Sequence, residues 1–298
     1  MEFKTIALHG RNADPRVAEP MQVLVEHLQR AGIDVITDAT GDDDLAARQV
    51  TEQTVAKQSD MIIAVGGDGT MLHAARIALQ HDVPLLGVNR GRLGFLADIT
   101  PDEMLQSVDQ VLAGDYYLEN RLLLLAERHR DGAVDGTAFA LNDVVLQRRE
   151  TGRMVDFETR IGGRLVNAHS GDGLIIATPT GSTAYALSCG GPIIEPALDA
   201  LVLVPICPHT LSDRPIVVPA SVQVEVKVLR RIDTKAEVTV DGHTIGDLLP
   251  EDRLIVRDAG HRVRLIHPPG YDYYEILRSK LHWGRDSRQR NPAPYETD

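Results

Sequence analysis

The hydrophobic pattern of this chain changes its period near residue 120, and this change constrains the fold more than any other feature. Before it, short apolar runs alternate with longer amphipathic segments. The spacing predicts strands at residues 3–8, 33–36, 61–65 and 83–88, and helices at residues 16–30, 44–57, 70–80 and 101–113. Because repeated strand–helix alternation implies right-handed crossovers, we expect a parallel sheet with helices on both faces.

From about Leu122 the apolar residues recur at every second position, as in the alternating valines of residues 222–228. Turn signals follow at short intervals, at Asp131-Gly132, Asp135-Gly136, Gly162-Gly163, Asp241-Gly242 and Ala259-Gly260. This pattern predicts an antiparallel, sandwich-like β domain with one helical insertion after Thr180. Residues 271–283 again have a helical pattern, and we expect this helix to return to the first domain.

We therefore predict an α/β + β fold with two domains, which a chain of 298 residues is long enough to form. The first is a Rossmann-like α/β domain with a parallel sheet, formed by residues 1–120 plus 267–298. The second is a β-rich domain formed by residues 121–266.

The composition excludes several classes of function. Lys and Arg number 31 against 43 Asp and Glu, a formal net charge of -12. Because such a surface repels phosphate backbones, no nucleic-acid partner is expected. The apolar runs are far shorter than the roughly 20 residues that cross a bilayer, and no secretory signal is visible, so we expect a cytoplasmic protein with no membrane partner. Neither the two cysteines nor the histidines have ligand spacing, so no metal site built from side chains is predicted.

The strongest local signal is the buried strand at residues 61–65, which runs directly into Gly66-Gly67-Asp68-Gly69-Thr70 and then an amphipathic helix. Glycines let an anion approach the backbone amides, and the helix presents free N–H groups to it. The segment is therefore a phosphate cradle in outline. It is neither a Walker A loop nor a GxGxxG fingerprint.

Asp68 is the unusual residue in this turn, because phosphate repels a carboxylate. It could bridge to a divalent cation, accept a proton from an attacking hydroxyl, or merely cap the helix at Thr70. The spacing alone leaves these roles open.

Three other segments stand out, and each has a purely structural explanation when taken alone. Residues 87–96 follow the fourth strand and carry Phe95, which could stack on a base or lie in the core. Asn142-Asp143 could simply end a strand. Residues 178–188 concentrate small hydroxyl side chains at a turn into a short helix, and capping of that helix would account for two of these hydroxyls but hardly for five.

Taken together, the segments Gly66–Thr70, Asn89–Phe95, Asn142-Asp143 and Thr178–Tyr185 resemble the NAD kinase family over most of the chain. The resemblance implies an α/β nucleotide-binding domain, a β-rich NAD-binding domain, and transfer of a phosphoryl group to the 2′-hydroxyl of the adenosine ribose of NAD. ATP or polyphosphate would be the donor, and Mg²⁺ or another divalent cation would be carried on the nucleotide. Relatives form homodimers or homotetramers, so a homo-oligomer is implied as well.

By this resemblance Asp68 is the general base, Asn142 and Asp143 hold ribose hydroxyls, and His243 lies near the donor. The other positions implied to bind the dinucleotide or line its pocket are Gly69, Phe95, Arg153, Ser170, Asp172, Thr183, Ala184, Tyr185, Ala186, Leu187 and Ser188.

Three positions depart from the family pattern. The family pair is often Asn-Glu where this chain has Asn142-Asp143. Ser170 stands where some relatives have a basic residue, and Arg153 where some have His. These departures leave the donor and the preference between NAD and NADH open, but not the class of reaction.

Two other functions compete with that of an NAD kinase. A lipid or other hydroxyl kinase of the same superfamily shares residues 66–70 but has no need for residues 178–188. A non-catalytic NADP(H)-binding regulator is disfavoured because Asp68 and Asn142-Asp143 are present.

Overall fold

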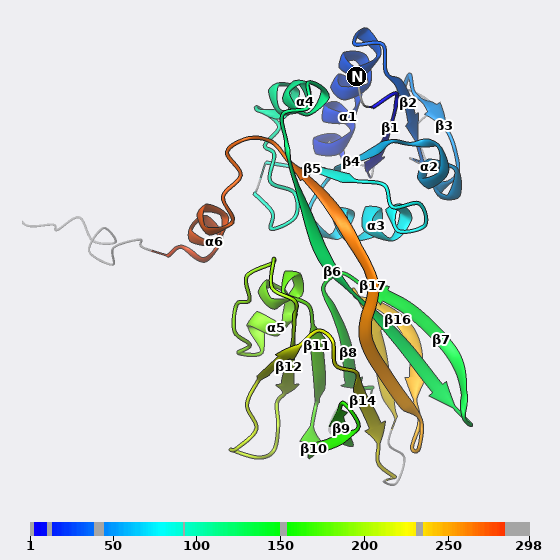
Figure 1. Ribbon diagram of the computed structural model, residues 1–298, viewed down its shortest axis with the longest axis vertical. Helices are drawn as coiled ribbons and strands as arrows, with labels where there is room; N and C mark the ends of the chain where they lie inside the picture. The colour runs from blue at the N-terminus through cyan, green and yellow to red at the C-terminus, as the bar shows by residue number, and fades with distance from the viewer. Residues whose placement is uncertain are drawn as a thin grey trace, which may run out of the picture.

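The computed structural model describes residues 3–10, 14–38, 45–91, 93–149, 154–230 and 235–283. Its first part is a parallel sheet in the order β5-β4-β1-β2-β3. The strands are β1 (Thr5–Gly10), β2 (Asp34–Thr37), β3 (Arg48–Gln49), β4 (Met61–Val65) and β5 (Leu85–Val88). Figure 1 shows this sheet at the top of the molecule.

Helices cover both faces of the parallel sheet, as predicted. One face packs against α1 (Pro15–Arg30) and α4 (Met104–Leu112). The other packs against α2 (Glu52–Gln58) and α3 (Asp68–Ala78). A sheet buried on both faces explains why all five residues of β4 are fully buried and apolar.

The helix expected at residues 44–57 is wrong in its first half. Residue 44 lies outside the described residues, and Arg48–Gln49 form the edge strand β3, paired in parallel with Ile36 and Thr37. The helix α2 begins only at Glu52, because the Thr51 side chain caps it by accepting the Thr54 N–H.

The second part is a β-sandwich. A six-stranded sheet of described residues has the order β13-β12-β11-β8-β15-β16. It faces an antiparallel layer in which β10, β9, β14, β17, β6 and β7 are successive neighbours. The bounds are β6 (Tyr117–Arg130), β7 (Ala133–Ala140), β8 (Asp143–Arg148), β9 (Val155–Ile161), β10 (Arg164–Gly171), β11 (Gly173–Ala177), β12 (Ala200–Ile206), β13 (Ile216–Pro219), β14 (Val224–Val228), β15 (Ala236–Val240), β16 (His243–Leu248) and β17 (Arg253–His267).

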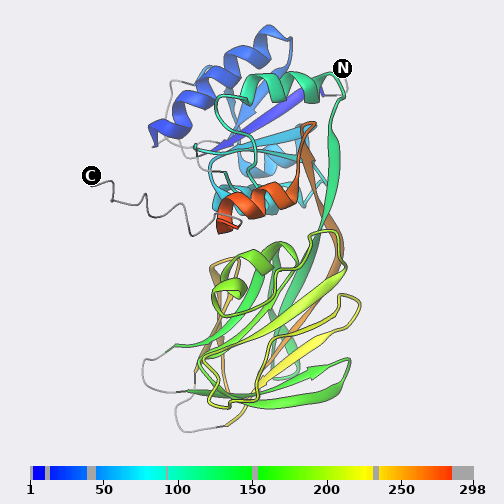
Figure 2. The ribbon, with the colours of Figure 1, turned by 90° about the vertical axis from the view of Figure 1, so that its left-hand side faces the viewer.

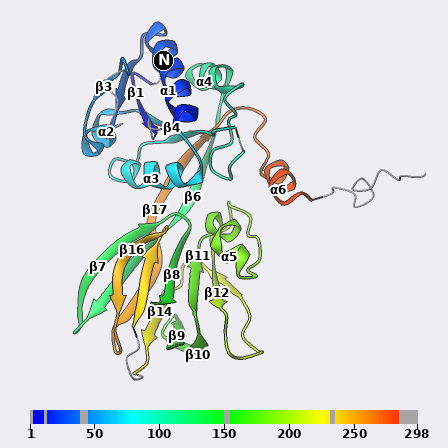
Figure 3. The same ribbon diagram turned by 180° about the vertical axis from the view of Figure 1, so that it is seen from behind.

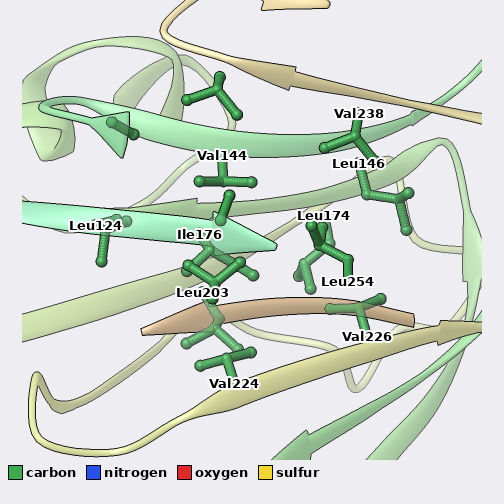
Figure 4. Close-up of a cluster of buried hydrophobic side chains, with 14 of the residues drawn as sticks. Leu124, Val144, Leu146, Leu174, Ile176, Leu203, Val224, Val226, Val238 and Leu254 are labelled. Carbon is green, nitrogen blue, oxygen red and sulfur yellow. The ribbon is translucent and has the colours of Figure 1, made fainter. Parts of the chain in front are cut away.

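The sandwich core lies between these two layers (Figure 4). Alternate apolar residues of β8, β11, β12 and β15 meet those of β6, β14 and β17, which is the period-two pattern of the sequence. Full burial of each Leu, Ile or Val contributes about 1.5–3 kcal/mol. The expected sandwich-like domain is therefore confirmed.

Two long strands join the parts into one sheet. β6 and β17 pair antiparallel from Tyr117–His267 to His129–Arg253, and the end of β17 then pairs in parallel with β5 at Leu265 and Leu85. Figure 2 shows both strands crossing from the upper to the lower part. The expected boundaries at residues 120/121 and 266/267 fall inside these strands, and the division into two domains there stays a prediction.

Two of the five turn signals are not turns between strands. Asp135-Gly136 lies inside β7 and Ala259-Gly260 inside β17, and each is close to a register shift in its pairing with β6. They are β-bulges, in which extra residues on one strand increase its bend.

The chain ends by returning to the first part. After β17, Asp272 caps α6 (Tyr273–Leu281), and Ile276 and Leu277 of this helix are buried. Residues 268–279 line one side of a hollow of about 390 Å³, and residues 93–110 of the first part line the other. The returning C-terminal helix is confirmed. No described helix combines the length and apolar character that crossing a membrane requires.

Candidate active site

The glycine-rich turn joins β4 to α3. The Gly66 N–H donates to the Val88 carbonyl at 2.8 Å, and a Cβ atom on Gly66 would overlap the Thr70 side chain. Gly67 is the N-cap residue of α3, and no side chain caps this end of the helix. The first N–H groups of α3 are therefore open to an anion.

Asp68 lies in the first turn of α3, and its carboxylate is fixed by a neighbouring loop. Oδ2 accepts the Phe95 N–H at 3.2 Å, and Oδ1 accepts the Leu96 N–H at 3.0 Å. The Thr70 N–H donates instead to the Gly67 carbonyl at 2.9 Å. The helix-cap explanation of Asp68 is therefore wrong, because its carboxylate binds a different segment of the chain.

Phe95 lies outside the core. Its ring is half-buried, and the Lys280 ammonium of α6 lies 5.7 Å from the ring centroid. This contact is a cation–π interaction between the loop that holds Asp68 and the returning C-terminal helix.

Asn142 and Asp143 are held by a residue that sequence analysis identified only as part of a turn. The Asp241 carboxylate accepts the N–H groups of Leu141, Asn142 and Asp143 at 2.8, 2.8 and 3.1 Å. Asp241 reaches them from a turn in which its φ is 46°. The Asn142 side chain is half-buried and makes no hydrogen bond within the described residues.

The charge of Asp241, which is half-buried, acts on the buried carboxyl group of Asp143. Burial, reinforced by the charge of Asp241, raises the pKa of Asp143 to about 7. Burial also raises the pKa of Asp241, although three backbone N–H groups and Arg76 oppose the rise. Since Asp241 receives the three amides, it carries the negative charge and Asp143 takes the proton.

The hydroxyl-rich segment lies directly on Asn142. Ala177, the last residue of β11, pairs with Asp143, and the Thr178 N–H donates to the Asn142 carbonyl at 2.9 Å. A Cβ atom on Gly181 would overlap that carbonyl, so the short helix η1 (Thr180–Thr183) approaches Asn142 as only glycine allows.

Four hydroxyls of this segment bind protein groups, more than the two that helix capping was expected to account for. They belong to Thr178, Thr180, Ser182 and Thr183. Thr178 binds the Leu141 carbonyl, and Ser182 donates to Pro179 and accepts from Ile194. These hydroxyls build the shape of the turn.

The short helix α5 (Tyr185–Ser188) follows at once. Ala184 and Leu187 are half-buried, Tyr185 and Ser188 are exposed, and Ala186 is fully buried in a cluster on the outer face of the six-stranded sheet. Burial raises the pKa of the Tyr185 hydroxyl, and nearby Cys189 and Asp172 raise it further.

Ser170 and Asp172 lie at the other end of β11 from Asn142. The Ser170 hydroxyl donates to Asp156, and Asp172 forms an ion pair with Arg148 at 2.9 Å. Ala177 is the last residue of this five-residue strand, so it lies roughly 15 Å from Asp172 at about 3.3 Å per residue. Asn142, Asp143 and η1 therefore lie at one end of β11 and Ser170 and Asp172 at the other, where the charge of Asp172 acts on Tyr185 of α5.

His243 and Gly69 are exposed, and Arg153 lies outside the described residues. The Nδ1 atom of His243 lies 3.0 Å from the Asp241 carbonyl. His243 and Arg76 of α3 both line a hollow of about 420 Å³.

The two halves of the site meet through α3. Leu141, which precedes Asn142, packs in one apolar cluster with Met71, Ala74 and Ala75 of α3 and with Leu96. Figure 3 shows α3 above the ends of β8 and β16. The helix that carries Asp68 therefore shares an apolar cluster with the segment that carries Asn142 and Asp143.

Sequence analysis also missed a buried charged cluster beside this site, formed by Asp98, Glu119, Arg121 and His267. Only one signal was available, the charges at Glu119 and Arg121 within an apolar strand. Among the described residues, no group of three or more His, Cys, Asp or Glu side chains is placed to hold a metal ion.

A parallel α/β sheet that continues into a β-sandwich, with an amide-held aspartate where the two parts meet, defines a two-part nucleotide-binding protein. Residues 11–116 match the family described as the ATP-NAD kinase N-terminal domain, and residues 141–268 match the ATP-NAD kinase C-terminal domain. The NAD kinase of Nitrosomonas europaea is 44% identical over 284 residues, covering 94% of this chain and 95% of that protein. The NAD kinase of Halorhodospira halophila is 46% identical over 290 residues, covering 95% and 94%. The chain belongs to the NAD kinase family.

Solved structures share this fold. The yeast NADH kinase complexed with NADH superposes with a TM-score of 0.84 at 23% identity, covering 100% of this chain and 90% of that one. An NAD kinase from Archaeoglobus fulgidus in complex with ATP superposes with a TM-score of 0.70 at 25% identity, covering 92% and 99%.

Proposed function

We propose that this protein transfers a phosphoryl group from ATP to the 2′-hydroxyl of the adenosine ribose of NAD, giving NADP, with Asp68 as the general base. The observation that carries the proposal is the fixing of the Asp68 carboxylate by the Phe95 and Leu96 N–H groups beside the open end of α3. A carboxylate held in this way can take the hydroxyl proton as the oxygen attacks phosphorus.

The donor phosphates would bind the amides of the glycine-rich turn and of the α3 N-terminus. Mg²⁺ or another divalent cation would be carried on ATP, where it neutralises charge on the transferred group. Each Asp68 oxygen accepts one amide and keeps a second lone pair, so contact with a hydrated cation needs no dedicated protein cage.

The acceptor would lie along β11. The free side chain of Asn142 and the Asp143 carboxyl group suit ribose hydroxyls, since amide and carboxyl groups bind both donors and acceptors. Thr183, Ala184 and Tyr185 would line the adenine region. Ser170 and Asp172 lie at the far end of β11 from Asn142, so they would contact a different part of the dinucleotide. We also propose that the protein works in the cytoplasm as a homodimer or homotetramer.

A matched pair of variants tests the general base. Asp60 also accepts two backbone N–H groups, from Lys4 and Thr5, but it lies at the opposite end of β4 from the glycine-rich turn. We expect Asp68→Asn to lower kcat by about 10²- to 10⁴-fold while NAD affinity stays within a few-fold. Asp60→Asn should leave kcat unchanged. Near-normal turnover in Asp68→Asn would remove Asp68 from this role.

The acceptor and the donor can be tested in one assay of NADP formation. NAD and NADH are offered with ATP, then with polyphosphate, and diacylglycerol replaces the dinucleotide in a parallel reaction. Formation of NADP from NAD and ATP supports the proposal, whereas phosphorylation of the lipid alone would contradict it.

A further inference from the structure

Arg121 is a buried cation on β6, the strand that crosses between the two parts of the molecule. Only 1% of its surface is exposed. A buried guanidinium group is costly unless several acceptors surround it. The residues that accept its hydrogen bonds therefore indicate why it is there.

Three acceptors surround the Arg121 guanidinium group. Its Nη2 atom lies 2.6 Å from Oε2 of Glu119 and donates to the Tyr271 hydroxyl at 3.2 Å. Its Nη1 atom donates to Oγ1 of Thr180 at 3.2 Å. Thr180 is the first residue of η1, the turn that lies on Asn142.

The network continues from Glu119 in the other direction. Nε2 of His267 lies 3.1 Å from Glu119, and Nδ1 of the same ring lies 2.7 Å from Asp98. The His267 ring also stacks on Tyr271 with 3.7 Å between the ring centroids. Two carboxylates therefore alternate with two cationic groups when His267 is protonated, and the charges of the network balance.

The two ends of this network lie beside the two halves of the site. Asp98 follows residues 94–97, the loop whose N–H groups hold Asp68, and the Gly94 N–H donates to the Ala97 carbonyl at 2.8 Å within that loop. Thr180, at the other end, accepts the Thr183 hydroxyl through its carbonyl at 3.2 Å. The network thus connects the loop that holds Asp68 to the turn η1, which lies on Asn142.

We propose that Arg121 is a positioning residue that fixes Thr180 and, through Glu119, His267 and Asp98, holds the turn η1 in register with the loop that binds Asp68. With 1% of its surface exposed, it would act through Thr180 and not by contact with a substrate. This inference rests on the proposed function, because it assigns Thr180–Thr183 to the NAD side of the site.

The Thr180 hydroxyl provides the sharpest test. Thr180→Val removes the acceptor at nearly constant shape, and Thr180→Ser keeps it. The control is Thr159→Val, because Thr159 is a buried threonine of the same sandwich whose Oγ1 has no partner within the described residues. Because loss of this hydrogen bond to a charged group would free the turn η1 beside Asn142, Thr180→Val should weaken NAD binding about tenfold.

Calorimetric binding of NAD and steady-state kinetics are measured for each variant. Thr180→Val should raise the Kd and KM for NAD while the KM for ATP stays within about twofold, and Thr180→Ser and Thr159→Val should match wild type. Equal effects of Thr180→Val and Thr180→Ser, or NAD binding by Thr180→Val within twofold of wild type, would overturn the proposal. A wild-type protein that binds no NAD would instead refute the proposed function.

The variant Arg121→Lys tests the residue that donates to the Thr180 hydroxyl. Lysine keeps the charge but cannot reach three acceptors in the same geometry. Combining Arg121→Lys with Thr180→Val gives a double variant. If Arg121 acts through Thr180, this double variant should bind NAD no more weakly than Arg121→Lys alone. If the fold loss of NAD affinity in the double variant equals the product of the two single losses, the two residues act separately and the proposal is wrong. Should Arg121→Lys not fold, the two Thr180 variants still decide the outcome.

Discussion

Gly94 leaves the space that the Asp68 carboxylate occupies: a Cβ atom on Gly94 would overlap Oδ1 of Asp68. The same loop supplies the two N–H groups that hold this carboxylate. The glycine is therefore required for close approach and not for an unusual φ.

Gly94→Ala should therefore displace Asp68. We expect kcat for NADP formation to fall by about 10²-fold or more, since a base displaced by an ångström loses much of its effect. Gly136→Ala is the control, because the nearest atom to its Cβ would be 3.7 Å away and its φ is not positive. Unchanged kcat in Gly94→Ala would show that the contact with Asp68 has no catalytic importance.

Asp143→Asn should stabilise the protein and weaken NAD binding. The folded-state pKa of Asp143 is about 7, above its usual value of 3.8, so folding favours the protonated form. The stability of wild type should therefore fall as pH rises from about 4 to about 7. At pH 8 the neutral amide should be more stable, by on the order of 1–4 kcal/mol.

Urea unfolding at pH 5 and pH 8 measures the change in stability, and the KM for NAD measures the change in binding. Asp102→Asn changes an exposed aspartate and should shift stability by less than about 0.5 kcal/mol. A stability advantage of Asp143→Asn that is the same at both pH values would contradict the raised pKa.

Asn142→Ala should raise the KM for NAD about tenfold or more, because its free side chain is assigned to the ribose hydroxyls. Fold and kcat should change little, since this side chain makes no hydrogen bond within the described residues. Steady-state kinetics with each substrate varied in turn provide the measurement. An unchanged KM would place the residue outside the acceptor pocket.

His267→Gln should remove a pH dependence of stability. Burial alone would lower the pKa of His267, but hydrogen bonds to Asp98 and Glu119 outweigh it and raise the pKa. The stabilisation is therefore complete below pH about 6.5 and is lost as pH rises through the folded-state pKa. We expect His267→Gln to cost about 3 kcal/mol at pH 6 and less at pH 9. A cost that does not change with pH would show that folding does not raise the pKa of His267.

The local elements of the first part could be predicted because their causes are local. The strand at residues 61–65 is a continuous apolar run, and it matches β4 residue for residue. The helix expected at residues 16–30 is α1, whose buried side chains repeat at helical spacing. By contrast, α2 begins later than expected. The side chain of Thr51 caps its first turn, and sequence analysis missed this cap because Thr51 lies inside the expected helix.

The features that were missed depend on residues far apart in the chain. Asp241 binds Asn142 across about a hundred positions, so its role was invisible beside the Asp-Gly turn signal. Charged residues usually face solvent, and sequence alone does not reveal that Glu119, Arg121 and His267 meet inside the protein. The register of β6 with β17 likewise depends on long-range pairing.

The continuity of β6 and β17 determines how the parallel sheet and the sandwich can move relative to each other. A single connecting loop would let the two parts rotate freely. The hydrogen-bonded ribbon of β6 and β17 resists sliding of one strand past the other and deforms mainly by bending. The extra residues around Gly260 interrupt that ribbon near its middle, where bending breaks the fewest ladder bonds. Relative motion of the two parts is therefore coupled to the curvature of this ribbon.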